Sequence, residues 1–226
     1  MSSCEDAYAA VRNRVAAAAT RSGHPARLLA VSKTQPAAAV RALAVLGQRE
    51  VGENYVQEAL AKQAELADLG LVWHLIGPLQ SNKCREVARH FDWLQSLDRD
   101  KLIEPLDRHR PDGLAPLNVL IQVNIDDETS KSGCAPAAVG GLATRIAAAS
   151  RLQLRGLMAI PEPSPDLARR RRAFERMREL FDALAVDHPQ IDTLSMGMSE
   201  DFELAIACGA TMVRVGSALF GARKPA

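Results

Sequence analysis

The sequence predicts an α/β fold, a single (β/α)8 barrel that covers residues 1–226 and carries an extra helix at its N-terminus. Three observations predict it. Short apolar runs alternate with helical segments along the chain, and strands that are apolar throughout are typical of parallel sheets covered on both faces. No linker or break in composition divides the chain. Eight such units in about 200 residues fit a closed barrel better than a doubly wound open sheet, although these barrels usually have about 250 residues.

Eight short apolar runs, each bounded by turn residues, are the expected strands. In chain order they cover 27–33, 49–54, 72–77, 91–96, 117–125, 152–160, 191–196 and 211–215. The run LNVLIQVNI at 117–125 is the clearest of them.

Helices are expected between these strands. The alanine-rich segment 9–20 precedes the first strand and is expected to cover the bottom of the barrel. Later helices are expected at 36–47, 56–69, 81–90, after Asp98, and at 136–150, 165–186, 199–208 and around 218. Pro36 suits the first turn of its helix, because the missing N–H has no intrahelical partner there. Asp98 is a good N-cap.

The composition is that of an ordinary globular protein. Of the 226 residues, 47% are hydrophobic and 24% are charged, and 28 basic against 27 acidic side chains leave a formal net charge of +1. That balance provides no global basic field for binding nucleic acid or an anionic membrane. Aromatic residues make up only 4% of the chain, which argues against a stacking surface for single-stranded nucleic acid.

We expect a cytoplasmic protein. The chain has no run of about 18 apolar residues for a membrane-spanning helix, and its first segment, MSSCEDAYAAVRNR, has acids where a signal peptide has a basic stretch and then an apolar one. The four cysteines are scattered and are expected to be free thiols in that compartment. They are Cys4, Cys84, Cys134 and Cys208, and none is spaced as a zinc ligand with the five histidines.

A parallel barrel places its functional residues at the carboxyl ends of the strands. Lys33 is the most informative of these, because it closes the apolar run 28–31. A lysine in the barrel mouth is desolvated, which lowers its pKa and frees the amine to attack a carbonyl carbon. The alternative is an exposed lysine at the end of a strand.

The loops after the seventh and eighth strands are where such barrels frequently hold a phosphate group. Here they are 195–199 and 216–217. Gly216 allows close approach of the backbone, and Ser217 begins a helical stub whose free N–H groups face an anion. Ser199 is expected to cap the next helix, with Glu200 and Asp201 in its first turn.

Arg214 lies at the end of a central strand, where a guanidinium needs an acceptor. Two acceptors are considered, the ring nitrogen of an aromatic cofactor and the carboxylate of Glu53. A lysine able to form an imine, a phosphate cradle and an arginine near a ring nitrogen together point to pyridoxal 5′-phosphate (PLP).

Five segments carry a family resemblance: LLAVSKTQP (28–36), VGENYVQEA (51–59), WHLIGPLQSNK (73–83), GLMAIP (156–161) and LSMGMSEDFELAIACGATMVRVGSALFG (194–221). They closely resemble the YggS/PROSC family of pyridoxal phosphate homeostasis proteins. The resemblance implies an alanine-racemase-like barrel with the cofactor held as a Schiff base on Lys33. It also implies that the phosphate is contacted by the loop containing Ser195, Met196, Gly197 and Ser199 and by Gly216 and Ser217. By the same resemblance, the ring side of the cofactor is contacted by Asn54 and Arg214. The loop 126–133 also resembles the family, without an assigned role.

The same residues are similar to those of the alanine racemase barrel, so racemisation of an amino acid is the alternative function. That reaction needs a second base, a tyrosine from a β-rich domain that the chain is expected to lack. Tyr55 is the one tyrosine expected near the site. Either it approaches the barrel mouth or it packs at the start of a helix. An arginine beside the ring nitrogen disfavours its protonation and makes the ring a poor electron sink.

We therefore expect a non-catalytic, monomeric carrier that stores, buffers or delivers PLP to apoenzymes inside the cell. A phosphate-binding barrel enzyme without an aldehyde cofactor is a third candidate.

Two other features are interpreted conservatively. The run 169–172, with Arg176 and Arg178, resembles a nucleic-acid patch, but nearby acids make a solvated helix face the better interpretation. His74 is either an acid–base group or a hydrogen-bonded histidine in the barrel mouth.

Overall fold

Eight parallel strands pair in chain order, and the last pairs with the first, so that the sheet closes into a barrel. The computed structural model describes residues 4–126, 132–162 and 164–221. The strands are β1 Arg27–Val31, β2 Glu50–Glu53, β3 Val72–Leu75, β4 Trp93–Leu97, β5 Leu117–Val123, β6 Leu152–Ala159, β7 Thr193–Ser195 and β8 Met212–Val215. The prediction of a (β/α)8 barrel is confirmed. Most of loop 126–133 lies outside the described residues.

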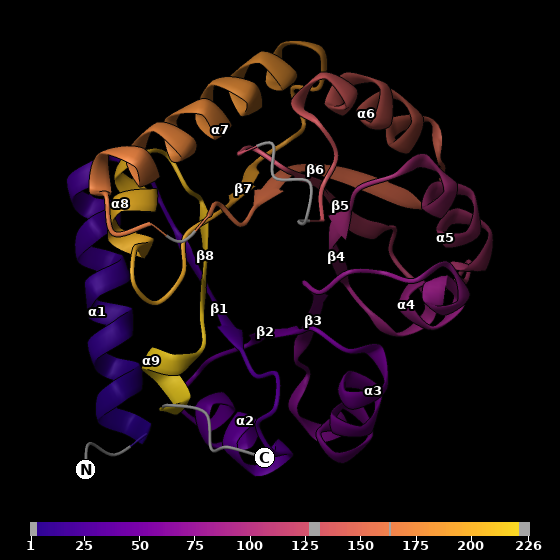
Figure 1. Ribbon diagram of the computed structural model, residues 1–226. Helices are drawn as coiled ribbons and strands as arrows, with labels where there is room; N and C mark the ends of the chain where they lie inside the picture. Colours follow the sequence, from indigo (N-terminus) through magenta and orange to yellow (C-terminus); the bar gives the residue numbers. More distant parts are fainter. Residues whose placement is uncertain (1–3, 127–131, 163, 222–226) are drawn as a thin grey trace.

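The helices form a ring around the barrel (Figure 1). They are α1 Cys4–Ser22, α2 Ala37–Val45, α3 Val56–Glu65, α4 Cys84–His90, α5 Ile103–His109, α6 Val139–Ala148, α7 Leu167–Asp187, α8 Phe202–Ala207 and α9 Ser217–Phe220. Within the described residues, four short 3-10 turns accompany them: η1 Ala67–Leu69, η2 Ser81–Lys83, η3 Asp100–Leu102 and η4 Pro136–Ala138.

The extra helix α1 lies in this ring beside α8, α9 and α2, and not across the bottom of the barrel as expected (Figure 1). Its buried side chains include Tyr8, Val11 and Val15. An exposed ion pair between Arg14 and Glu203 also joins α1 to α8. The helix therefore covers the seam at which β8 meets β1.

The expected cap at Asp98 is wrong, and α2 begins one residue later than expected. Arg99, and not Asp98, occupies the N-cap position of η3, and no side chain caps that turn. The Asp98 carboxylate instead accepts a hydrogen bond from the Arg99 guanidinium. Pro36 is the N-cap of α2 and lies one position before its first turn.

The core has two regions. The larger region lies between the outer face of the strands and the helices, and it includes Phe91, Phe174 and Phe202, which are fully buried. Inside the barrel, small apolar clusters such as Leu29, Ile76 and Met212 lie beside buried polar side chains. All four cysteines are free thiols, of which only Cys4 is exposed. None of the described helices is long and apolar enough to cross a membrane.

Candidate functional site

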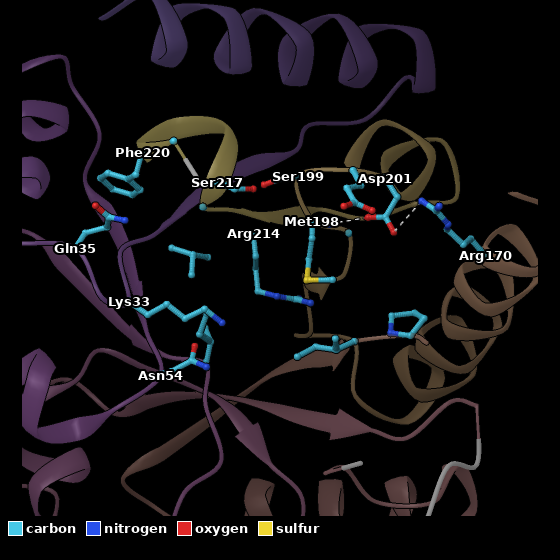
Figure 2. A pocket seen from close by; sticks show the side chains of 18 of the residues that line it. Lys33, Gln35, Asn54, Arg170, Met198, Ser199, Asp201, Arg214, Ser217 and Phe220 are labelled. Atoms are coloured by element: carbon cyan, nitrogen blue, oxygen red, sulfur yellow. Dashed lines mark hydrogen bonds and ion pairs between the residues drawn. The ribbon is translucent and has the colours of Figure 1, made fainter. Parts of the chain in front are cut away.

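A cavity of about 350 Å³ opens at the carboxyl ends of the strands (Figure 2). Seven of the nine residues predicted for the site line it: Lys33, Asn54, Gly197, Ser199, Arg214, Gly216 and Ser217. They come from the ends of β1, β2, β7 and β8. The closure of the barrel therefore brings the first and last strands of the chain to one site.

Lys33 and Asn54 lie next to each other at one side of the cavity (Figure 2). Lys33 is half-buried in the turn that follows β1. The next residue, Thr34, has a φ of 64°, the only positive value at a non-glycine residue in the described part of the chain. A β-branched residue rarely adopts this left-handed conformation. The turn that presents Lys33 is therefore strained.

The opposite edge of the cavity carries two hydroxyl groups, those of Ser199 and Ser217 (Figure 2). Ser217 begins α9, as expected. Ser199 does not cap α8, because that helix begins only at Phe202 with Asp201 at its N-cap position. The Asp201 carboxylate accepts a hydrogen bond of 2.8 Å from the backbone N–H of Met198. Ser199 is thus part of a tight turn whose conformation Asp201 fixes.

Two glycines allow this edge to form. Gly197 has a φ of 90°, and a Cβ atom added there would lie 2.5 Å from Cβ of Ala205. A Cβ atom added at Gly216 would lie 3.1 Å from the carbonyl oxygen of Val31. Larger residues at either position would push apart the segments that line the cavity.

Arg214 points from β8 into the interior of the barrel and is only 3% exposed. Its guanidinium donates hydrogen bonds of 2.8 Å to Oγ of Ser195 and to the carbonyl oxygen of Ala159. Burial lowers its pKa to about 10, so that it is still a cation at neutral pH. The alternative in which Glu53 neutralises it is wrong, because Glu53 pairs with Lys62.

The remaining two predicted residues, Ser195 and Met196, do not line the cavity. Ser195 ends β7 with its side chain inside the barrel, and Met196 is fully buried in the outer core. Consecutive residues of a strand face opposite sides of the sheet, so the two cannot both reach the mouth. Ser195 acts on the site through Arg214.

A polar chain continues below Ser195. Its hydroxyl donates 2.7 Å to Oε1 of Gln95, and the Gln95 amide nitrogen lies 3.0 Å from Nδ1 of His74. His74 stacks on Trp93, with ring centroids 5.1 Å apart. Its Nε2 atom lies 4.0 Å from a carboxylate oxygen of Glu50.

His74 is therefore inside the barrel, and the expectation that it lies in the mouth is wrong. Complete burial lowers its pKa well below the ordinary value, and the nearby Arg27 cation lowers it further. The ring is neutral at neutral pH and does not reach the cavity.

A second buried polar cluster lies behind the Lys33 turn. The ammonium of Lys62, in α3, is 2.7 Å from Oε1 of Glu53 and 2.8 Å from Oε1 of Glu58. Sequence reasoning considered Glu53 only as a partner for Arg214 and did not consider Lys62. A lysine at helical spacing within a mostly polar segment gives no signal that it is buried.

Sequence reasoning also missed several residues that line the cavity, among them Gln35, Ile160, Arg170 and Phe220. Arg170 belongs to the basic run 169–172, for which the sequence favours a solvated helix face. It is mostly buried and lies 3.9 Å from the Asp201 carboxylate. The interpretation holds for its neighbours, which form exposed or half-exposed ion pairs: Arg169 with Glu162, Arg171 with Glu175, Arg172 with Asp166 and Arg178 with Asp182.

Neither tyrosine lines the cavity in the described part of the chain. Tyr8 is buried in α1, and its hydroxyl lies 3.4 Å from Gln48. Tyr55 is 62% exposed at the start of α3, so the expected packing there is not seen. The described residues contain no group of histidines, cysteines and acids arranged to hold a metal ion.

Taken together, the cavity offers an amine, a buried cation and a pair of hydroxyls on glycine-bounded turns. A primary amine attacks carbonyl carbons, and hydroxyl and backbone N–H groups bind anions. The arrangement therefore suits a small molecule with a carbonyl group at one end and an anionic group at the other.

Comparisons with known proteins agree with this geometry. Residues 7–224 match the family described as "Alanine racemase, N-terminal domain". The chain is 55% identical to the pyridoxal phosphate homeostasis protein of Pseudomonas aeruginosa over 226 residues, which is 99% of this chain and 97% of that protein.

Two solved structures of PipY from Synechococcus elongatus are also similar. The structure without PLP has a TM-score of 0.88 and 40% identity, and the match covers 97% of this chain and all of PipY. The structure with PLP bound has a TM-score of 0.81 and 42% identity, with 92% of this chain and 99% of PipY covered.

Proposed function

Because the chain belongs to the alanine racemase N-terminal domain family, and within it to the pyridoxal phosphate homeostasis proteins, we propose that it binds pyridoxal 5′-phosphate in the cavity at the barrel mouth. The whole chain, residues 1–226, then acts as one PLP-binding domain. The observation that carries the proposal is that Lys33, Arg214 and the Ser199–Ser217 edge line one cavity.

The residues present fit this cofactor. PLP supplies an aldehyde that a lysine amine converts to an imine, and it also carries an aromatic ring nitrogen and a phosphate group. Lys33 is the amine that would hold the aldehyde carbon as a Schiff base, with Asn54 beside it (Figure 2). Arg214 would face the ring nitrogen. Ser199, Gly216 and Ser217 would hold the phosphate, where Gly197 and Gly216 leave room for the backbone to approach it.

Arg214 also indicates what the site does not favour. Both of its hydrogen-bond acceptors among the described residues are neutral oxygen atoms, and the Asp201 carboxylate acts on it there through charge alone. A cation beside the ring nitrogen disfavours protonation of that nitrogen. The ring then withdraws electrons poorly, and chemistry at the Cα atom of an amino acid loses its main source of stabilisation.

The proposed role is therefore to hold PLP and release it, in storage, buffering or delivery to apoenzymes, and not to turn over an amino acid. Racemisation would require a second base on the far face of the substrate, and the exposed Tyr55 does not line the cavity. We further propose that the protein acts as a monomer in the cytoplasm. Four free thiols are in keeping with a reducing compartment.

The test is an absorption spectrum of the protein mixed with PLP. The unmodified chain is expected to show a near-visible imine band, and borohydride is expected to fix the cofactor on the peptide that contains Lys33. Lys33→Ala removes the band. Lys83→Ala, which changes a lysine that does not line the cavity, keeps it. A full band in Lys33→Ala would overturn the proposal.

Two further assays test the role. A PLP-loaded sample is expected to restore activity to an apoenzyme that needs PLP, and L-alanine is expected to remain unracemised relative to the Lys33→Ala control. Production of D-alanine well above that control would instead establish the racemase.

A further inference from the structure

Lys62 is buried in a way that is unusual for a lysine. Its side chain is 6% exposed, whereas lysines are almost never fully buried unless they are paired. The ammonium nitrogen has three acceptors within 2.8 Å: the carbonyl oxygen of Ser32, Oε1 of Glu53 and Oε1 of Glu58. An ammonium has three N–H donors, so every one of them is used.

All three acceptors connect Lys62 to the turn that carries Lys33. Ser32 immediately precedes Lys33, and its hydroxyl donates a short hydrogen bond to the same Oε1 atom of Glu53. Thr34 immediately follows Lys33, and its backbone N–H donates 2.6 Å to Oε1 of Glu58. The two carboxylates thus hold the residues on both sides of Lys33, and Lys62 holds both carboxylates.

The held segment is the strained one. Thr34 has a φ of 64°, a conformation that is unfavourable for a β-branched residue and persists only where the surroundings enforce it. The hydrogen bond from its N–H to Glu58 is an enforcing contact of this kind. Without it, the backbone after Lys33 would relax toward an ordinary conformation and turn the lysine side chain away from its present direction.

A purely structural role does not account for this arrangement. Burying an ion pair contributes little net stability, and well-packed apolar side chains often serve as well. Burial also raises the pKa of Glu53, and Oε2 of Glu53 has no hydrogen-bond partner among the described residues. The cluster is thus an inefficient way to stabilise a barrel, whereas its contacts converge on the two neighbours of Lys33.

We propose that Lys62 is a positioning residue for Lys33: with Glu53 and Glu58 it holds the turn 32–34 so that the Lys33 amine faces the cavity before the ligand arrives. The inference rests on the proposed function, because it assigns Lys62 a part in the reaction of Lys33 with PLP. Lys62 itself does not line the cavity.

The experiment follows the rate at which the imine band forms after PLP is mixed with the protein. Lys62→Met keeps an unbranched side chain one atom shorter than lysine and removes its charge. We expect it to slow band formation about tenfold, given the usual cost of enforcing such a backbone conformation. Lys83→Met is the matched control, since Lys83 also faces a carboxylate, that of Glu86 at 4.0 Å, but lies outside the cavity. It is expected to react at the unmodified rate.

Rescue separates positioning from stability. Thr34→Gly, added to Lys62→Met, is expected to recover most of the lost rate, because glycine adopts a positive φ without strain. A defect that arose only from a weakened barrel would not recover, since glycine does not restore a buried charge pair. If Lys62→Met fails to fold, Glu58→Ala replaces it, because the Glu58 side chain is 27% exposed and its loss removes the acceptor of Thr34.

The outcomes are distinguishable. Absence of the band in the unmodified chain overturns the proposed function, and the inference with it. A normal rate in whichever of Lys62→Met and Glu58→Ala folds overturns the inference alone. A slow rate that Thr34→Gly does not rescue also overturns it, because the turn is then not the element on which Lys62 acts.

Discussion

The hydroxyl of Ser195 accepts a hydrogen bond of 2.8 Å from the guanidinium of Arg214, and this one contact fixes the direction of every hydrogen bond below it. A guanidinium can only donate, so the Ser195 hydroxyl proton is directed to Oε1 of Gln95. The Gln95 amide therefore donates to Nδ1 of His74. The proton of the neutral His74 ring is then on Nε2, which faces Glu50.

Ser195→Ala tests the upper end of this chain. It removes an acceptor from the buried Arg214 and a donor from Gln95, and unsatisfied buried groups cost about 1–3 kcal/mol. We expect the free energy of unfolding in urea to fall by about that amount and PLP to bind more weakly. The control is Ser96→Ala, which removes another buried hydroxyl, one that donates 2.6 Å to the carbonyl oxygen of Gly77. The control is expected to lose stability without losing affinity, and equal affinity in both variants would contradict the role of Ser195.

His74 predicts a pH dependence of stability. Its pKa in the folded protein is well below 6.5, so below about pH 6.5 the unfolded chain binds a proton that the folded chain does not. Stability is therefore expected to fall as the pH falls through this range, by up to about 1.4 kcal/mol per pH unit for one such site. His74→Gln, which keeps an acceptor for Gln95, is expected to remove this part of the slope.

Glu50 and Glu53 act in the opposite direction, because burial raises the pKa of both. The folded protein binds their protons first, so acidification stabilises it through these two groups. The measurement is urea unfolding of the unmodified chain and of His74→Gln between about pH 5 and 8, a range around the ordinary histidine pKa of about 6.5. The difference between the two curves gives the contribution of the His74 imidazole to the pH dependence of the free energy of unfolding. Parallel curves for the two proteins would show that His74 does not contribute to the pH dependence of stability.

Gly216→Ala tests the close approach of β8 to the Lys33 strand. The added methyl group would lie 3.1 Å from the carbonyl oxygen of Val31, so one of the two segments must shift by a few tenths of an ångström. We expect PLP affinity to fall by about threefold to tenfold, which corresponds to roughly 1 kcal/mol, in a fluorescence titration.

The matched control for that variant is Gly141→Ala. Gly141 is in α6, and an added Cβ atom would meet nothing within 4 Å. Alanine is a better helix former than glycine, so the control is expected to gain about 0.5–1 kcal/mol of stability with unchanged affinity. A loss of affinity in the control would mean that the effect at Gly216 is not local.

Much of this architecture could be predicted from the sequence. Parallel strands buried on both faces are nearly continuous apolar runs, so β5 and β6 are visible in the sequence without further information. The sequence places the carboxyl ends of β1, β3 and β5 two residues too far along the chain. The extra residues include polar side chains such as Ser32, Lys33 and Asn124, and at these points the chain leaves the sheet and enters the loops at the carboxyl end of the barrel.

The candidate site, too, could be predicted from the sequence only in part. Lys33, Gly216 and Ser217 follow from the rule that function lies at the carboxyl ends of barrel strands, and all three line the cavity. Contacts that depend on the orientation of a side chain did not follow from that rule. Three features depend on three-dimensional packing, which a single sequence does not encode locally. They are the burial of Met196, the position of His74 inside the barrel and the cluster around Lys62.

The pairing of β8 with β1 across the seam beneath α1 has a consequence for biosynthesis. Lys33 is translated well before Arg214, Gly216 and Ser217. A nascent chain carries Lys33 before the opposite edge of the cavity exists, so the proposed capture of the coenzyme must await the synthesis of β8 and its docking on β1.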